Sequence, residues 1–193
     1  NIALAVAIAD RHGVPREVAL DGIRQARPDP GASKIHRHEL DGGTLIWIDL
    51  FGVNDVQSAE MNIRMIIDWI GNDGEVVFLI NNREDRQFRS VQFAEMAADN
   101  ADNAKILVVG ETVGNLSREI VNRNPETRIE TPKIPQTATP QDIAALANAT
   151  AMDPLVIVGL ANIHTEDASR LRRALEKTQT EWVPSAAARR SIA

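Results

Sequence analysis

Two arginines stand close together just after the most hydrophobic central stretch of the chain. Arg83 and Arg86 follow EVVFLINN (75–82), with Asp85 between them, and an amphipathic helix pattern begins there. Guanidinium groups bind carboxylates through paired hydrogen bonds, and the unpaired N–H groups of a helix N-terminus attract anions. The pattern favours an anion-binding loop, although an Arg–Asp pair on a solvated loop is the simpler interpretation.

Polar residues follow two other apolar stretches in the same way. Asn54 and Asp55 come between one such stretch and a helix pattern, while Asn162 and His164 follow the last apolar stretch of the chain. Asp is a preferred helix N-cap, so this interpretation is favoured for Asp55. For His164, a structural role and a functional role are equally open.

Short apolar strands alternate with amphipathic helices beyond a hairpin signal, in which two alternating stretches flank DGG (41–43). This order predicts an α/β fold with a Rossmann-like, mostly parallel sheet and helices on both faces. Ligands of such sheets bind at the carboxyl ends of the strands. We therefore expect the site in the loops that follow the strands: FGVND (51–55), NNREDR (81–86), GET (110–112) and ANIHT (161–165).

Residues 1–26 predict two short helices that are too small to bury their apolar faces against each other alone. The chain begins inside the first of them, which suggests a truncated start. RPDPGAS (27–33) then places two prolines and a glycine close together, as expected of a linker. We expect residues 1–30 to be the end of a preceding domain with its linker, 31–182 to be the α/β domain, and 183–193 to be a flexible tail.

Composition and missing motifs exclude several functions. The net charge of -6 and the pI of about 5.2 argue against nucleic-acid binding, which needs clustered Lys and Arg. There is no cysteine, no P-loop motif, no GxGxxG and no GxSxG, and no apolar run reaches ~18 residues. The four histidines fit no zinc pattern, so no metal site is expected. His36 and His38 are expected on the exposed face of a strand.

Five strings in this order resemble one family. They are DPGASKI (29–35), FGVNDVQSAEMNI (51–63), NNREDRQFRSVQFAE (81–95), VVGET (108–112) and VGLANIH (158–164). Together with NIALAVAIADRHGV (1–14), they resemble the junction and C-terminal domain of Mur-type amide ligases. The closer resemblance is to the ATP-dependent ligase subunit of bacterial poly-γ-glutamate synthase, and it covers residues 1 to about 165.

The resemblance implies a ligase in which ATP phosphorylates a carboxylate and the amine of glutamate attacks the acyl phosphate. It implies that ATP and Mg²⁺ are held mainly by a domain upstream of Asn1, on which this chain docks, so the chain alone is expected to be inactive. It also implies a growing polyglutamate substrate and membrane-embedded partner subunits. The expected location is then cytoplasmic, at the inner face of the membrane.

Residue by residue, the resemblance implies nucleotide contacts for Asn1 at the adenine and for Lys34 at the phosphates. Leu50 stands where many Mur ligases carry an Asp for the ribose, so Asn54 or Asp55 is expected to supply that contact. No catalytic residue is assigned. The residues implied in binding the amino-acid substrate are Asn54, Arg83, Arg86, Asn162 and His164.

Two other hypotheses stay open at this point. The chain could be a Rossmann-like binding or interaction module without catalysis, in which the apolar face of residues 1–26 docks on a partner. It could also belong to another Mur-type enzyme, which adds glutamate to folate or to a cell-wall precursor. Those enzymes more often carry a D-Y-A-H-type sequence where this chain has LFGVND (50–55).

Overall fold

The computed structural model describes residues 2–26, 33–70, 74–100, 105–147 and 154–176. The chain divides into two compact units, residues 1–30 and 31–193. Asn1, the linker residues 27–32 and the expected tail at 183–193 lie outside the described residues.

The first unit holds the two helices that its sequence predicts. These are α1 (Ile2–Arg11) and α2 (Arg16–Gln25), with Pro15 at the N-cap of the second. Within these two helices no residue is buried, and large apolar side chains such as Leu4 and Val18 are exposed. The pair is therefore too small to cover its own apolar faces, as the sequence indicated.

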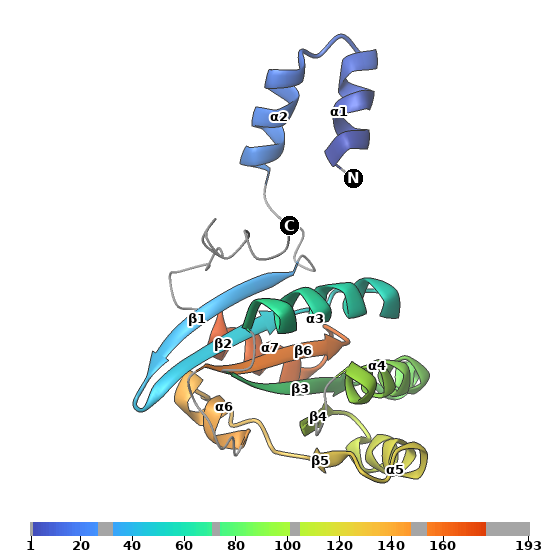
Figure 1. The fold of residues 1–193 in the computed structure, drawn as a ribbon, viewed down its shortest axis with the longest axis vertical. Helices are drawn as coiled ribbons and strands as arrows, with labels where there is room; N and C mark the ends of the chain where they lie inside the picture. The colour runs from blue at the N-terminus through green and yellow to red at the C-terminus, as the bar shows by residue number, and fades with distance from the viewer. Residues whose placement is uncertain (1, 27–32, 71–73, 101–104, 148–153, 177–193) are drawn as a thin grey trace. The chain divides into compact units, whose positions relative to one another are not determined.

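The second unit is built on a six-stranded sheet with the order β1-β2-β6-β3-β4-β5 (Figure 1). All neighbours are parallel except β1 and β2, which form the predicted hairpin. The α/β fold with a mostly parallel sheet is confirmed. The strands are β1 (Lys34–Leu40), β2 (Gly43–Asp49), β3 (Glu75–Asn82), β4 (Lys105–Gly110), β5 (Arg128–Glu130) and β6 (Leu155–Ala161).

Helices cover both faces of this sheet. One face carries the three helices that follow β2, β3 and β4, while the opposite face carries the two that precede and follow β6. A short 3-10 turn, η1 (Glu84–Arg86), precedes α4. The helices are α3 (Val56–Ile70), α4 (Gln87–Asn100), α5 (Val113–Arg123), α6 (Pro140–Leu146) and α7 (Glu166–Leu175).

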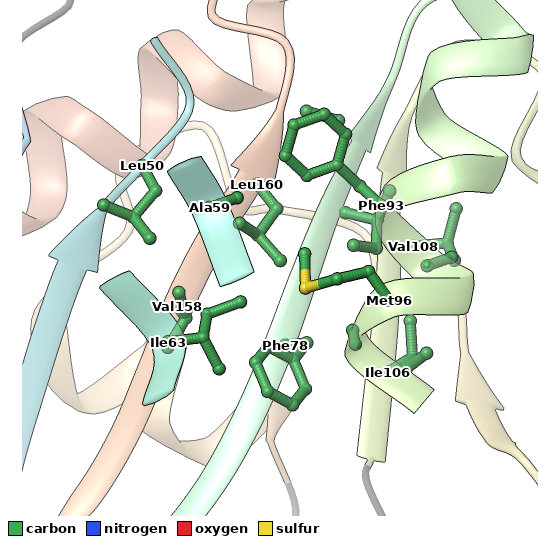
Figure 2. Close-up of a cluster of buried hydrophobic side chains, with 14 of the residues drawn as sticks. Leu50, Ala59, Ile63, Phe78, Phe93, Met96, Ile106, Val108, Val158 and Leu160 are labelled. Atoms are coloured by element: carbon green, nitrogen blue, oxygen red, sulfur yellow. The ribbon is translucent and has the colours of Figure 1, made fainter. Parts of the chain in front are cut away.

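Alternating residues of the strands fill two separate hydrophobic cores, as the two-residue period of a strand requires. In β2, Ile46 and Ile48 pack toward α3 and α4, while Leu45 and Trp47 pack toward α7. Figure 2 shows the first core, in which Leu50 lies with side chains of α3, α4 and β6. A sheet buried on both faces holds its strand ends rigidly, and this fixes the loops that follow them.

The expectation that His36 and His38 are exposed is wrong. Both are buried in β1, opposite Trp47 and Leu45 respectively. The ring Nε2 of His38 lies 2.9 Å from the backbone oxygen of Leu175, and burial lowers the pKa of this histidine. The sequence of β1 alternates polar and charged residues, so it does not reveal that α7 covers one of its faces.

Candidate functional site

The carboxyl ends of β2, β6, β3 and β4, which are four of the five parallel strands, lie along one edge of the sheet, here called the carboxyl edge. The register pairs Asp49 with Gly159, Asn81 with Ala161, and Asn82 with Gly110. The loops that follow these strands therefore lie side by side. Two non-glycine residues there, Ala161 and Thr112, have φ angles of 84° and 46°, and strained backbone of this kind concentrates at functional sites.

Three arginines gather at this edge, after β3. Arg83 and Arg86 are joined by Arg89, in the first turn of α4, and the three are here called the arginine cluster. Nη2 of Arg83 lies 2.8 Å from Oδ2 of Asp85, and Nε of Arg86 lies 4.0 Å from the same oxygen. Burial lowers the pKa of Arg89, and the charges of Arg86 and Arg83 lower it further. The cluster repels further cations and favours an anion.

The backbone donors of the loop are less free than its sequence suggests. The N–H of Glu84, at the start of η1, donates to Oε2 of Glu111 over 2.9 Å. A carboxylate therefore already occupies this donor. Two carboxylates from this chain, those of Glu111 and Asp85, thus already accept from donors of the loop that the sequence predicts for an anion.

The loop after β2 meets the arginine cluster. Nη1 of Arg89 donates to Oδ1 of Asn54 over 3.4 Å, and its Nη2 donates to the backbone oxygen of Val53. Asp55 caps α3, since its Oδ1 accepts the N–H of Ser58 over 2.7 Å, and this hydrogen bond lowers the pKa of Asp55. The N-cap interpretation of Asp55 is confirmed, while a ribose contact by Asn54 or Asp55 stays a prediction.

The two residues expected after β6 lie in different surroundings. Asn162 is buried, and its Nδ2 donates to the backbone oxygen of Asn81 over 3.0 Å and to Oγ of Ser90 over 3.2 Å. Thr165 caps α7 and also donates to Oδ1 of Asn81. His164 is exposed at the edge. Asn162 thus ties β6 to β3 and α4, and substrate contacts by either residue stay predictions.

Lys34 lies in a second group of charges, away from the arginine cluster. Its Nζ is 3.1 Å from Oε2 of Glu176, while Nε of Arg172 is 2.9 Å from Oδ2 of Asp49 and 2.8 Å from Oε1 of Glu176. These four residues are here called the ion-pair cluster. Lys34 is thus engaged by a carboxylate, and its contact with nucleotide phosphates stays a prediction.

Burial sets the protonation of the ion-pair cluster. The carboxyl group of Asp49 is 3% exposed, and burial raises its pKa to about 6. Burial alone would also raise the pKa of Glu176, but hydrogen bonds from Arg172, Asp49 and Lys34 outweigh this and lower it. Of the two carboxyl groups, Asp49 is therefore the one that takes up a proton first as the pH falls. Leu50, the next residue, faces the opposite core and offers no polar atom to a ribose.

Asp49→Asn should abolish the loss of stability that accompanies ionisation of Asp49 as the pH rises. Because the folded pKa of Asp49 is raised from 3.8 to about 6, its proton stabilises the fold at low pH, and this stabilisation is lost as the pH rises through 6. Urea unfolding should show the variant gaining roughly 2 kcal/mol relative to wild type between about pH 4.5 and about pH 7.5. If the difference in unfolding free energy between the variant and wild type stayed the same across this range, the raised pKa of Asp49 would be contradicted.

Sequence reasoning missed Arg89, Arg172 and Glu176. Arg89 had a signal, since residues 83, 86 and 89 recur every three positions, as on one side of a helix. Arg172 and Glu176 had none, because their partners come from β1 and β2, more than a hundred residues earlier. The structure brings Asn54, Arg83 and Arg86 into one region through Arg89, and it places Lys34 in the other cluster.

Neither a metal centre nor a membrane span is found in the part of the chain that the structure describes. Within those residues, no three His, Asp or Glu side chains are grouped so that they could hold a metal ion. Carboxylates close to the predicted nucleotide contacts are already engaged: Asp55 caps α3, Asp49 pairs with Arg172, and Glu176 pairs with Lys34 and Arg172. These side chains do not fit a magnesium ion. Among the described helices, none is long and apolar enough to cross a membrane.

The fold and the arginine cluster define an α/β domain with three arginines at its carboxyl edge, and comparison with known proteins places it in a family. Residues 35–178 match the model of the poly-gamma-glutamate synthase CapB C-terminal domain. The chain belongs to this family.

Two curated relatives are similar to the chain. One is the PGA synthase CapB of Bacillus subtilis (strain 168), which is 29% identical over 167 residues, or 85% of this chain and 41% of the relative. The other is the capsule biosynthesis protein CapB of Bacillus anthracis, 28% identical over 117 residues, or 61% of this chain and 25% of the relative. The chain thus spans less than half the length of either relative.

Proposed function

We propose that this chain is the amino-acid-binding part of an ATP-dependent amide ligase that extends poly-γ-glutamate. The observation that carries the proposal is the meeting of Asn54 with the arginine cluster at the carboxyl edge. Family membership supports it, because both relatives are named for polyglutamate or capsule synthesis. A domain on which this chain docks, and partner subunits at the inner face of the membrane, belong to the same proposal.

The proposed reaction has two steps. The terminal phosphoryl group of ATP passes to a carboxylate oxygen of the acceptor, which gives an acyl phosphate and ADP. The amine of glutamate then attacks the acyl carbon and loses a proton, while the C–O bond to phosphate breaks and an amide bond forms. Nothing in this chain needs to form a covalent bond, so its contribution is to bind and orient glutamate.

Glutamate suits the carboxyl edge by its charge. It carries two carboxylates, and each guanidinium can offer paired hydrogen bonds to one of them. Asn54 adds an amide that can donate or accept at the amine side of the substrate. Asp85 already engages Arg83 at 2.8 Å, so a bound carboxylate would have to displace it. Asp85 is 60% exposed, and a pair this open to solvent is weak enough to yield.

Arg83→Ala and Arg86→Ala in the full-length ligase test the proposal. A hydrogen bond to a charged group contributes roughly 1.5–3 kcal/mol. Each variant should therefore raise the KM for glutamate roughly 10- to 100-fold. The KM for ATP should change much less, because neither Arg83 nor Arg86 is among the predicted nucleotide contacts, and Lys34 lies in the ion-pair cluster. Steady-state kinetics with the two substrates titrated separately measure both effects.

Two control variants separate binding from surface electrostatics. Arg64→Ala removes an exposed arginine that pairs with Glu60 at 2.6 Å on α3, and it should leave the KM for glutamate unchanged. Asp85→Asn removes the competing carboxylate and should lower that KM. If Arg83→Ala and Arg86→Ala behave like Arg64→Ala, then Arg83, Asp85 and Arg86 form only a surface ion pair and the proposal fails.

A further inference from the structure

Arg89 joins two loops of the carboxyl edge that are distant in sequence. It lies in the first turn of α4, after β3, yet both of its terminal nitrogens reach the loop that follows β2. Nη1 donates to the side chain of Asn54 at 3.4 Å, and Nη2 donates to the backbone oxygen of Val53. One guanidinium thus holds a side chain and a main-chain atom of the same loop.

The other contacts of Arg89 fix its direction. Its Cζ lies 5.4 Å from the ring centroid of Phe93, one turn further along α4, and Phe93 is fully buried. A guanidinium over an aromatic face is stabilised by the ring, and its planar shape suits this packing. Nε of Arg89 is buried without a hydrogen-bond partner among the described residues. The side chain therefore points its two terminal nitrogens, and not Nε, at the loop.

Other hydrogen bonds hold the two ends of this loop. The N–H of Leu50 bonds to the oxygen of Gly159 over 2.9 Å, and the N–H of Val53 closes a turn on Leu50 over 3.0 Å. Asp55 then caps α3. Between these anchors, Val53 and Asn54 are held against α4 by the bonds from Arg89.

We infer that Arg89 is a positioning residue for the amino-acid substrate, which holds Asn54 beside Arg83 and Arg86 through its contacts with Val53 and Phe93. This inference rests on the proposed function, since it assigns a role toward the same ligand. Arg89 does not itself need to touch glutamate. Its two terminal nitrogens are occupied by the loop, whereas the ion pairs of Arg83 and Arg86 within the described residues are made with the exposed Asp85.

Arg89→Lys tests the inference, because lysine keeps the charge but cannot hold two oxygens with a planar fork. The variant is made in the full-length ligase, with Arg118→Lys as the matched control. Arg118 is an exposed arginine of α5, and its hydrogen bonds to Gly114 and Asn115 stay within that helix. Arg89→Lys should raise the KM for glutamate about tenfold with kcat within about threefold, which is the pattern for lost ground-state binding. Arg118→Lys should change neither.

Two further measurements show whether Arg89 acts through the loop. Hydrogen exchange of the backbone amides at 52–54 should accelerate in Arg89→Lys and stay unchanged in Arg118→Lys. In an Asn54→Ala background, Arg89→Lys should add less than about threefold to the KM for glutamate, because coupled residues give non-additive effects. An unchanged exchange rate, or a full tenfold addition in that background, would overturn the positioning role.

The outcomes distinguish this inference from the function on which it rests. If Arg83→Ala and Arg86→Ala raise the KM for glutamate while Arg89→Lys does not, the inference is wrong and the proposed function stands. If Arg89→Lys accelerates exchange in the loop while none of the three variants changes glutamate binding, the proposed function is wrong and Arg89 has only a structural role.

Discussion

Gly159→Ala should destabilise the α/β domain by about 3 kcal/mol, the upper part of the usual cost of overpacking. Gly159 lies in the middle of the sheet, in β6 between β2 and β3. A Cβ atom there would come within 2.4 Å of Cη2 of Trp47 and 2.9 Å of Cζ of Phe51. Both rings are buried and pack against each other at a centroid distance of 5.6 Å. Neither ring can move without displacing the other.

Urea unfolding followed through tryptophan fluorescence measures this cost. Gly114→Ala is the matched control, because a Cβ atom at Gly114 in α5 would meet nothing within 4 Å. That change should stabilise the domain by roughly 0.5–1 kcal/mol, since alanine favours a helix more than glycine does. A Trp47→Phe background should reduce the cost of Gly159→Ala by making room for the methyl group. Equal costs in both backgrounds would show that the ring contact is not the cause.

Much of the fold follows from the sequence because the strands and helices of this chain obey simple periods. The apolar stretch EVVFLINN (75–82) became β3 with the predicted bounds. DGG (41–43) marked the turn of the hairpin, where Leu40 pairs with Gly43. Both signals are local, so neighbouring residues alone determine them. The loops at the carboxyl edge then follow from the parallel arrangement of the strands.

Other features depend on contacts that local patterns do not encode. β5 (Arg128–Glu130) has three residues of mixed polarity and forms by pairing with β4 at the edge of the sheet. The buried ring of His38 contacts the backbone of Leu175 in α7, which lies more than a hundred residues later. No local period signals such a partner, so the sequence of β1 suggested exposure instead.

In the candidate site too, some residues could be predicted from the local sequence, while others depend on contacts with distant segments. Arg83 and Arg86 were found because they follow a strand in an obvious loop. Arg89 was missed although its spacing carries a helical signal, because its role depends on the distant loop at Val53. Lys34 was assigned by resemblance alone, and the structure adds that Glu176 holds its ammonium group. A nucleotide phosphate would therefore compete with a carboxylate of α7 for this lysine.

Arg172→Met should destabilise the domain by about 3–5 kcal/mol near neutral pH, the cost of breaking a buried ion pair by removing one partner. The guanidinium of Arg172 lies between two carboxylates, at 2.9 Å from Asp49 and 2.8 Å from Glu176. Without it, Asp49 is left almost fully buried, and the remaining cation of the ion-pair cluster, Lys34, is paired with Glu176. Methionine keeps most of the apolar stem of the side chain, so the loss is electrostatic.

Acid should relieve much of this loss, because the pKa of Asp49 is already raised to about 6 by burial and losing the guanidinium raises it further. Urea unfolding at about pH 5 should therefore show a smaller cost for Arg172→Met than at about pH 7.5.

Arg173→Met, at an exposed position of α7, controls for charge on the same helix and should cost under about 1 kcal/mol at both pH values. The double variant Asp49→Asn/Arg172→Met should recover part of the stability, because the buried charge is then gone. A cost that is the same at both pH values and in both backgrounds would show that Arg172 stabilises α7 by packing alone, and that the ion-pair cluster contributes little to the fold.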